Sequence, residues 1–187
     1  MTVSHTTSGA DRLMLVGVSL NPQNNETVSS VTYNGVNLTF VGAADQLNDT
    51  RAEIWRLVAP ATGTHDVVIN FSADLSYGAV AGAMTFTGVD QSTPLGTFVS
   101  ANARSAGPAT VDVSSGTNQL VFDTVACEDC LSLTVGSGQT ERWNLTYADD
   151  YVMGAASTEP GATTVTMSWT LGSINDWAIG AVPINPK

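Results

Sequence analysis

The segment from Gln139 to Tyr151 combines aromatic and polar side chains in a way that could bind a sugar. Trp143, Tyr147 and Tyr151 recur at intervals of four residues. Four polar residues accompany them: Arg142, Asn144, Asp149 and Asp150. Aromatic rings stack on the apolar faces of sugars, and polar side chains bond their hydroxyls. The segment therefore predicts a carbohydrate-binding site. The alternative is that Trp143 caps one end of the fold and the tyrosines support loops.

Cys127 and Cys130 are the only two cysteines, and their spacing allows three kinds of chemistry. A Cys-x-x-Cys pair can be half of a zinc site, a redox pair or a local disulfide. Zinc needs two more ligands, and His5 and His65 lie far away in the sequence. A redox pair needs a helix N-terminus to lower its thiolate pKa, and no helix pattern follows Cys130. We expect a disulfide, with free thiols as the next alternative and a metal last.

Catalytic patterns are sparse, so we expect no enzyme. The chain has no Gly-x-Ser-x-Gly elbow and no His-Glu-x-x-His motif. Glycoside hydrolysis needs two carboxylates across a cleft. Of the five glutamates, only Glu53 falls on an expected strand, and no second acid accompanies it there. A hydrolase would need such an acid facing Glu53.

Loop carboxylates offer a second kind of site, a structural calcium ion. Calcium is bound by carboxylate and carbonyl oxygens, commonly from loops. The candidates are Asp45, Asn48 and Asp49, with the Asp149-Asp150 pair as a further possibility. No EF-hand loop is present, and no other cofactor is expected.

Composition excludes several classes of partner. The 187 residues include 17 acids and 6 bases, which gives a net charge of −11. Such a charge repels phosphate backbones and anionic lipids, so we expect no nucleic-acid partner. No apolar run is long enough to cross a bilayer, so we expect no membrane insertion. The N-terminus has no signal-peptide pattern. The chain is therefore expected to be either intracellular or one module of a longer secreted protein, with other domains as partners.

Short apolar runs separated by Gly, Pro, Asn and Ser predict a β-sandwich or barrel held in one domain, residues 1–187. Asn34-Gly35 predicts a type I′ hairpin between two of the runs. The stretch from Tyr77 to Val89 is rich in Ala and Gly, which suggests close approach of another backbone. No internal repeat is recognisable. The expected strands include Arg12–Leu20, Val28–Tyr33, Val36–Val41, Asp66–Phe71, Leu95–Ser100, Ala109–Val113, Gln119–Ala126, Leu131–Val135, Thr164–Leu171 and Asp176–Ile184.

One segment, residues 43–59, is ambiguous. Ala44, Leu47, Ile54 and Leu57 fall near helical spacing, so propensity alone permits a helix. The competing interpretation is a loop over residues 44–50 followed by a strand over residues 51–58.

The order of the motifs resembles a set of bacterial β-sandwich modules, mostly of unknown function, in long extracellular multidomain proteins. The resemblance is carried by "SHTTSGADRLMLVGVSL", "VSSVTYNGVNLTFVG", "AEIWRLVAPATGTHDVVINFS", "VAGAMTFTGVDQSTPLGT", "GQTERWN" and "STEPGATTVTMSWTL" followed by "WAIGAVPINP". It covers about Ser4 to Pro186. It implies an extracellular or cell-surface location and favours the strand over the helix at residues 51–58. The Cys127–Cys130 segment departs from the pattern.

We therefore expect an all-β fold, a two-sheet antiparallel β-sandwich of the jelly-roll type. The leading functional hypothesis is a non-catalytic extracellular accessory module that recognises polysaccharide. The rival is a structural spacer or adhesion module of a surface or virion fibre, with no small ligand. A sandwich hydrolase is third. Exposure of Trp143 separates the first two, because the spacer predicts a buried Trp143 and no concave aromatic site.

Overall fold

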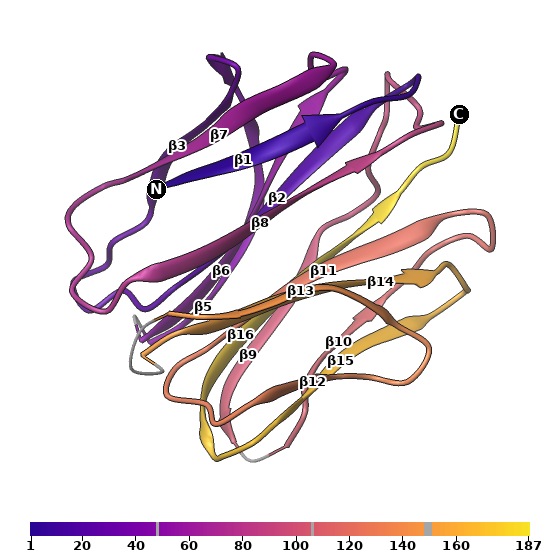
Figure 1. Ribbon diagram of the computed structural model, residues 1–187. Coiled ribbons are helices and arrows are strands. Elements are labelled where there is room, and N and C mark those ends of the chain that lie inside the picture. The colour runs from indigo at the N-terminus through magenta and orange to yellow at the C-terminus, as the bar shows by residue number, and fades with distance from the viewer. Residues whose placement is uncertain (48, 106, 148–150) are drawn as a thin grey trace.

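The computed structural model describes residues 1–47, 49–105, 107–147 and 151–187, and in these ranges every regular element is a β-strand (Figure 1). The first eight strands are β1 (Thr2–Thr7), β2 (Leu13–Leu20), β3 (Val28–Tyr33), β4 (Val36–Asn37), β5 (Thr39–Gln46), β6 (Thr50–Val58), β7 (Gly63–Phe71) and β8 (Ala79–Phe86). The other eight are β9 (Val99–Ser105), β10 (Ala109–Val113), β11 (Leu120–Cys127), β12 (Leu133–Val135), β13 (Thr140–Thr146), β14 (Met153–Pro160), β15 (Val165–Leu171) and β16 (Asn175–Ile184).

These strands form four antiparallel sheets. Sheet I has the order β1-β7-β3-β4, sheet II β5-β6-β2-β8, sheet III β13-β14-β11-β16-β9, and sheet IV β10-β15-β12. The predicted all-β antiparallel class is confirmed. The structure has four sheets rather than the expected two, because each half of the chain forms its own face-to-face pair of sheets.

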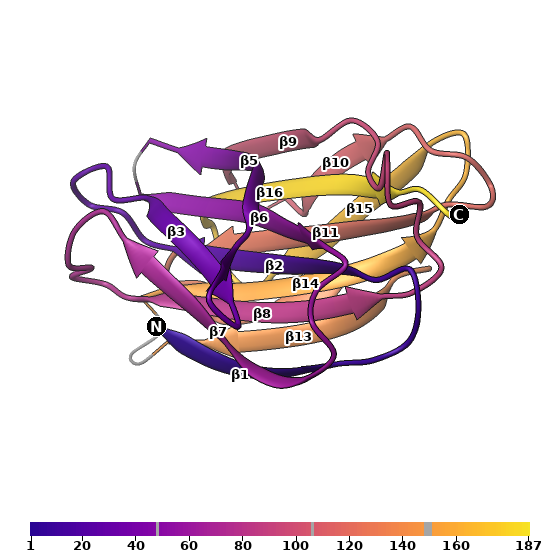
Figure 2. The ribbon, with the colours of Figure 1, turned by 90° about the horizontal axis from the view of Figure 1, so that it is seen from above.

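The four sheets stack in the order I, II, III, IV (Figures 1 and 2). One apolar cluster fills the space between sheets I and II, and another fills the space between sheets III and IV. A third cluster joins sheet II to sheet III, so the two sandwiches share an apolar central interface. Its buried members are Leu13, Leu15, Ile54, Val89, Phe122, Ala156, Val182 and Ile184.

The two halves, residues 1–90 and 99–187, repeat one strand plan. The order β1-β7-β3 has its counterpart in β10-β15-β12, and β5-β6-β2-β8 has its counterpart in β13-β14-β11-β16. The fold thus contains a repeat that is not recognisable in the sequence. Counterpart strands share their alternation of buried positions but not their residues. Val67 and Ile69 point into the core from β7, where β15 places Trp169 and Leu171.

Two local predictions can be compared directly with the backbone. Asn34 and Gly35 have φ values of 48° and 75°, and Tyr33 pairs with Val36, so the predicted type I′ hairpin is confirmed. The helix considered for residues 43–59 is wrong, because β5 and β6 pair along this segment. Their side chains alternate between the two faces of sheet II, which outweighs the weak helical spacing. No helix in the described ranges is long and apolar enough to cross a membrane.

Candidate functional site

Three carboxylates meet where strands of sheets II and III begin or end. Asp49 lies between β5 and β6, Glu128 directly follows β11, and Asp176 belongs to β16. Each offers one oxygen, and these oxygens lie within 4.8 Å of one another. Segments far apart in the sequence therefore build a common acidic site from both halves of the molecule.

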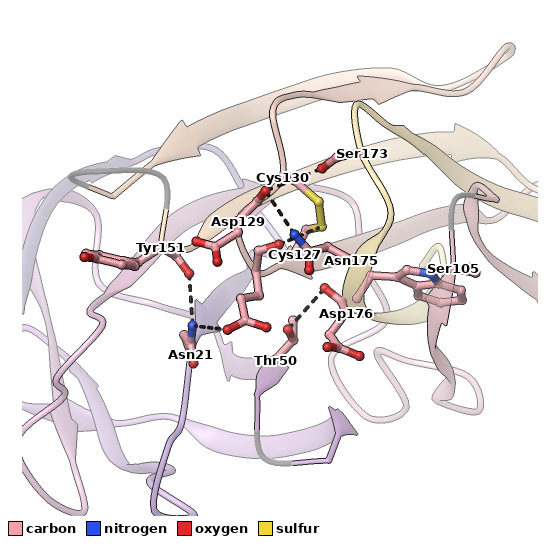
Figure 3. The surroundings of a disulfide bond; sticks show 12 residues. Asn21, Thr50, Ser105, Cys127, Asp129, Cys130, Tyr151, Ser173, Asn175 and Asp176 are labelled. Carbon is pink, nitrogen blue, oxygen red and sulfur yellow. Dashed lines mark hydrogen bonds between the residues drawn. A yellow bond between two sulfur atoms is a disulfide. The ribbon is translucent and has the colours of Figure 1, made fainter.

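Neighbouring side chains hold two of these carboxylates in place. Asp176 is buried and accepts hydrogen bonds from Arg104 Nη1 at 2.8 Å and Gln46 Nε2 at 3.3 Å. Its backbone carbonyl accepts from Thr50 Oγ1 at 3.2 Å (Figure 3). Asn21 Nδ2 donates to Glu128 Oε1 at 3.3 Å, and also to the carbonyl of Tyr151. These hydrogen bonds join β16 to β5, β6 and β9, and separately join the residue after β2 to the loop after β11.

The electrostatics of this site favour a cation. Burial raises the pKa of Glu128, and repulsion from Asp49, Asp129 and Asp176 adds to the increase. Arg104 neutralises only part of the negative charge and is itself largely exposed. Carboxylate oxygens are the hard ligands that Ca²⁺ prefers. Asp49, Glu128 and Asp176 fit the donor set of a calcium site and could hold the ion.

A disulfide fixes the loop that carries Glu128. Cys127 and Cys130 are bonded to each other, which confirms the predicted pairing. Within the loop, Asp129 has a φ of 44°, and its carbonyl accepts a hydrogen bond from Asn175 Nδ2 at 3.1 Å (Figure 3). Both sulfurs belong to the core between sheets III and IV. The disulfide therefore anchors the acidic loop to the interior of the protein.

The predicted calcium ligands are only partly brought together. Asp49 belongs to the acidic site. Asp45 instead lies 2.9 Å from Arg51 Nη1 in an ion pair. Asn48 lies outside the described residues, as do Asp149 and Asp150 from the predicted sugar site and the second calcium candidate.

Trp143 is partly buried, and it does not form an open platform. Its indole lies against Gly17 and Gly82 of sheet II, where an added Cβ would come within 2.9 Å and 2.3 Å of the ring. It also packs on Phe122, with ring centroids 5.8 Å apart. Two small residues on sheet II therefore make room for a large one on sheet III. This close approach was expected from the Ala- and Gly-rich composition of residues 77–89.

The other predicted sugar ligands are distributed over two faces of β13. Asn144 donates to the carbonyl of Leu133 in sheet IV at 2.8 Å, on the side away from sheet II. Arg142 donates to Thr158 Oγ1 on the neighbouring strand β14. Tyr147 and Tyr151 are 43% and 40% exposed. The structure therefore does not gather these residues around one ligand position.

The tyrosines do form a small exposed group of their own. Tyr77 and Tyr151 make an edge-to-face pair with centroids 5.0 Å apart. Tyr147 covers Gly78 at the start of β8 and lines a groove of about 410 Å³. The opposite wall of the groove comes from sheet I, including Met1, Ile69 and Phe71. Two aromatic faces at a groove could bind a flat apolar surface.

Glu53, the one acid considered for hydrolysis, is occupied structurally. It is 1% exposed and accepts hydrogen bonds from Trp55 Nε1 at 2.9 Å and from the amide of Val28 at 3.2 Å. Arg51 Nε also donates to Glu53 Oε1, at 2.7 Å. Such a carboxylate organises the core between sheets I and II.

Asp123 is the buried acid that residue patterns did not reveal. It is fully buried between sheets III and IV, where it accepts hydrogen bonds from Trp169 Nε1 at 2.8 Å and from the amide and hydroxyl of Ser157. Burial raises its pKa to about 7, against the lowering effect of these hydrogen bonds. The available signal was a single carboxylate in the otherwise apolar run from Leu120 to Cys127.

None of the protein families, curated proteins or solved structures compared with this chain matches it.

Proposed function

We propose that this chain is a non-catalytic structural module, a spacer or adhesion unit of a surface or fibre protein. The observation that carries the proposal is the place of Trp143, which is packed against Gly17 and Gly82 in the contact between the two sandwiches. The one tryptophan of the predicted sugar segment is therefore used to join the halves. This arrangement gives a single stiff body.

We further propose that each half is a jelly roll. In an eight-stranded jelly roll, the first strand pairs with the eighth, the eighth with the third and the third with the sixth. The eight strands β9 to β16 include the order β9-β16-β11-β14, which supports this assignment. The other sheet would pair second with seventh and seventh with fourth, as in β10-β15-β12. The first half follows the same plan from the second strand onward.

An extracellular or cell-surface location fits this role. Disulfides persist in oxidising compartments, and the Cys127–Cys130 bond is compatible with one. The high negative charge favours a surface that resists association.

Differential scanning calorimetry of the full chain tests the structural proposal. A stiff module should unfold in one transition whose calorimetric and van't Hoff enthalpies agree. Two separate transitions in the unaltered chain would show that the halves are independent and would contradict the proposal.

Polysaccharide recognition is the second candidate, and the exposed tyrosines support it. Tyr147 lines the groove of about 410 Å³, and Tyr77 and Tyr151 pack edge to face with each other. A glycan array with the unaltered chain and with Tyr147→Ala tests this candidate. Binding that the substitution abolishes would favour it over the spacer, while failure to bind neutral and acidic glycans would end it.

A further inference from the structure

The corresponding edge strands β5 and β13 each carry a β-bulge, and the two bulges leave an arginine in different surroundings. The residue skipped in the pairing with the neighbouring strand is Val41 in β5 and Arg142 in β13. Beside the bulge, β6 places Arg56 where β14 places Thr158. Each half therefore has one guanidinium at this position. It comes from the edge strand in the second half and from the strand next to the edge in the first.

The guanidinium of the second half has an acceptor within the chain, and that of the first half does not. Arg142 donates from Nε and Nη2 to Thr158 Oγ1, at 2.9 Å and 2.7 Å. In the first half Arg56 itself occupies the position of that acceptor, and the bulge residue Val41 has an apolar side chain. The other four basic side chains all have hydrogen-bond acceptors or ion-pair partners: Arg12, Arg51, Arg104 and Lys187. Arg56 alone of the six has no such partner in the described ranges.

The surroundings of Arg56 make this lack of a partner costly. Its side chain lies on the same face of sheet II as Ile54 and Val58, which belong to the apolar cluster between sheets II and III. The residue is partly buried. A polar group that leaves water without finding a partner loses solvation that nothing in the protein replaces. An external anion beside the guanidinium would restore that interaction.

Arg56 lines a groove of about 200 Å³ between the two halves. β5, which forms one wall, lies beside β9 and β16 (Figure 2). The opposite wall comes from the segment that precedes β9. Arg56 is therefore the one charged side chain among the lining residues, which are Phe40, Val41, Arg56, Leu95, Gly96 and Phe98.

Packing holds the aromatic walls of this groove in place. The ring of Phe98 covers Gly42 of β5 and Gly180 of β16, where an added Cβ would come within 2.4 Å and 2.8 Å of it. Phe40 packs edge to face on Trp55, with ring centroids 5.2 Å apart, and remains 47% exposed. Walls that are already ordered bind a ligand without a further loss of side-chain entropy.

We propose that this groove binds a small monocarboxylate with a flat apolar body, whose carboxylate pairs with Arg56 and whose body packs on Phe40 and Phe98. A planar guanidinium matches a carboxylate through two parallel hydrogen bonds. The groove is smaller than the range of about 300–1,000 Å³ typical of ligand pockets, so it admits a single ring with a short acidic arm. One cation balances one negative charge, and the net charge of −11 disfavours a polyanion. The inference is independent of the structural role and of sugar recognition at the Tyr147 groove.

Titration of the full ¹⁵N-labelled chain with phenylacetate tests the proposal. We expect saturable chemical-shift changes at the amides of Val41, Leu95 and Gly96 and at the Nε–H of Arg56. Phenylacetamide has the same body without the charge, and glucuronate has the charge on a polar body. Both should bind at least about tenfold more weakly than phenylacetate.

Three results of this titration would overturn the proposal. The first is the absence of saturable changes at the groove with phenylacetate. The second is equal binding of phenylacetamide, which would show that Arg56 does not select the charge. The third is tighter binding of glucuronate than of phenylacetate, which would assign the groove to an acidic sugar.

Two variants separate Arg56 from its counterpart in the other half. Arg56→Gln removes the cation from the groove, and we expect a loss of affinity for phenylacetate of at least about tenfold. Arg142→Gln removes the guanidinium beside the other bulge and should bind phenylacetate as the unaltered chain does. If Arg56→Gln fails to fold, Arg56→Lys, which keeps the charge without the planar fork, should bind more weakly than the unaltered chain. Unchanged affinity in the Arg56 variant, or an equal loss in Arg142→Gln, would overturn the proposal.

Discussion

The two halves follow one strand plan but place different groups in their interiors. Between sheets I and II, the buried carboxylate is Glu53, whose partners include the guanidinium of Arg51 at 2.7 Å. Between sheets III and IV, the buried carboxylate is Asp123, whose hydrogen-bond donors are neutral groups of Trp169, Ser157 and Gln139. Each acid accepts a bond from a tryptophan indole. A repeated architecture thus tolerates a charge in either core, but only one of the two charges is neutralised by a cation.

Loss of the contact between the halves should have the largest effect. Trp143→Ala removes a ring that fills the space over Gly17 and Gly82, and it should cost about 3–5 kcal/mol of unfolding free energy. Calorimetry should then resolve two transitions, since the halves would no longer unfold together. Leu145→Ala, an exposed position on the same strand, is the control and should cost less than about 1 kcal/mol. Equal effects of the two substitutions would contradict the claim that Trp143 holds the two halves together.

The charge on Asp123 should make stability depend on pH. Below the ordinary pKa of 3.8, this carboxyl is protonated in the folded and the unfolded chain. As pH rises toward about 7, Asp123 ionises first in the unfolded chain. The free energy of unfolding therefore falls by on the order of 4 kcal/mol. Denaturant unfolding of the unaltered chain and of Asp123→Asn at several pH values isolates this contribution. A difference between the two proteins that stays constant from pH 4 to pH 8 would contradict it.

Removal of the other buried charge should act differently. Glu53→Gln leaves Arg51 without its buried partner and should cost about 3 kcal/mol near neutral pH. Asp123→Asn relieves a desolvated charge and should cost less at the same pH, because it leaves no cation behind. Glu141→Gln, at an exposed position, controls for the substitution itself. A larger loss of unfolding free energy for Asp123→Asn than for Glu53→Gln would contradict this difference between the two cores.

The disulfide should contribute less than either core. The closed loop between Cys127 and Cys130 is short, so the chain-entropy rule gives about 2 kcal/mol. Reduction, or the double change Cys127→Ser with Cys130→Ser, should lower the unfolding free energy by about that amount. Because the halves unfold together, the most protected amides of β7 and of β11 should lose protection to the same extent. A loss confined to the second half would contradict the single transition.

The acidic site should give the smallest change. Without added metal, Glu128→Gln relieves repulsion and should raise stability by about 1 kcal/mol at low salt. In millimolar calcium the unaltered chain should gain stability and the variant should gain less. A calcium response that is the same in both proteins would exclude Glu128 as a ligand.

Much of the local structure could be predicted from the sequence. Short apolar runs between turn-forming residues correctly placed strands such as Ala109–Val113, and Asn34-Gly35 correctly predicted the hairpin type. These features depend on neighbours in the chain. The doubling of the sandwich could not be predicted, because counterpart strands keep the alternation and change the residues.

Prediction of the site was poorer for a related physical reason. The spacing of Trp143, Tyr147 and Tyr151 suggested a common surface, but the spacing does not tell which face of β13 is covered. Sheet II covers one face, and Gly82 admits the indole. The acidic site joins Asp49, Glu128 and Asp176 across both halves, so no stretch of sequence contains it.

Amide hydrogen exchange along two counterpart strands tests the central claim most directly, that the halves share a plan but only the second has a complete sheet edge. The account predicts rapid exchange in the free chain at Ala83 and Thr85 of β8, whose amides point away from β2 and which are less buried than Ala79 and Ala81. It predicts slow exchange at Trp177, Ile179 and Ala181 of β16, which face β9. Equal protection of the two sets in the free chain would contradict it.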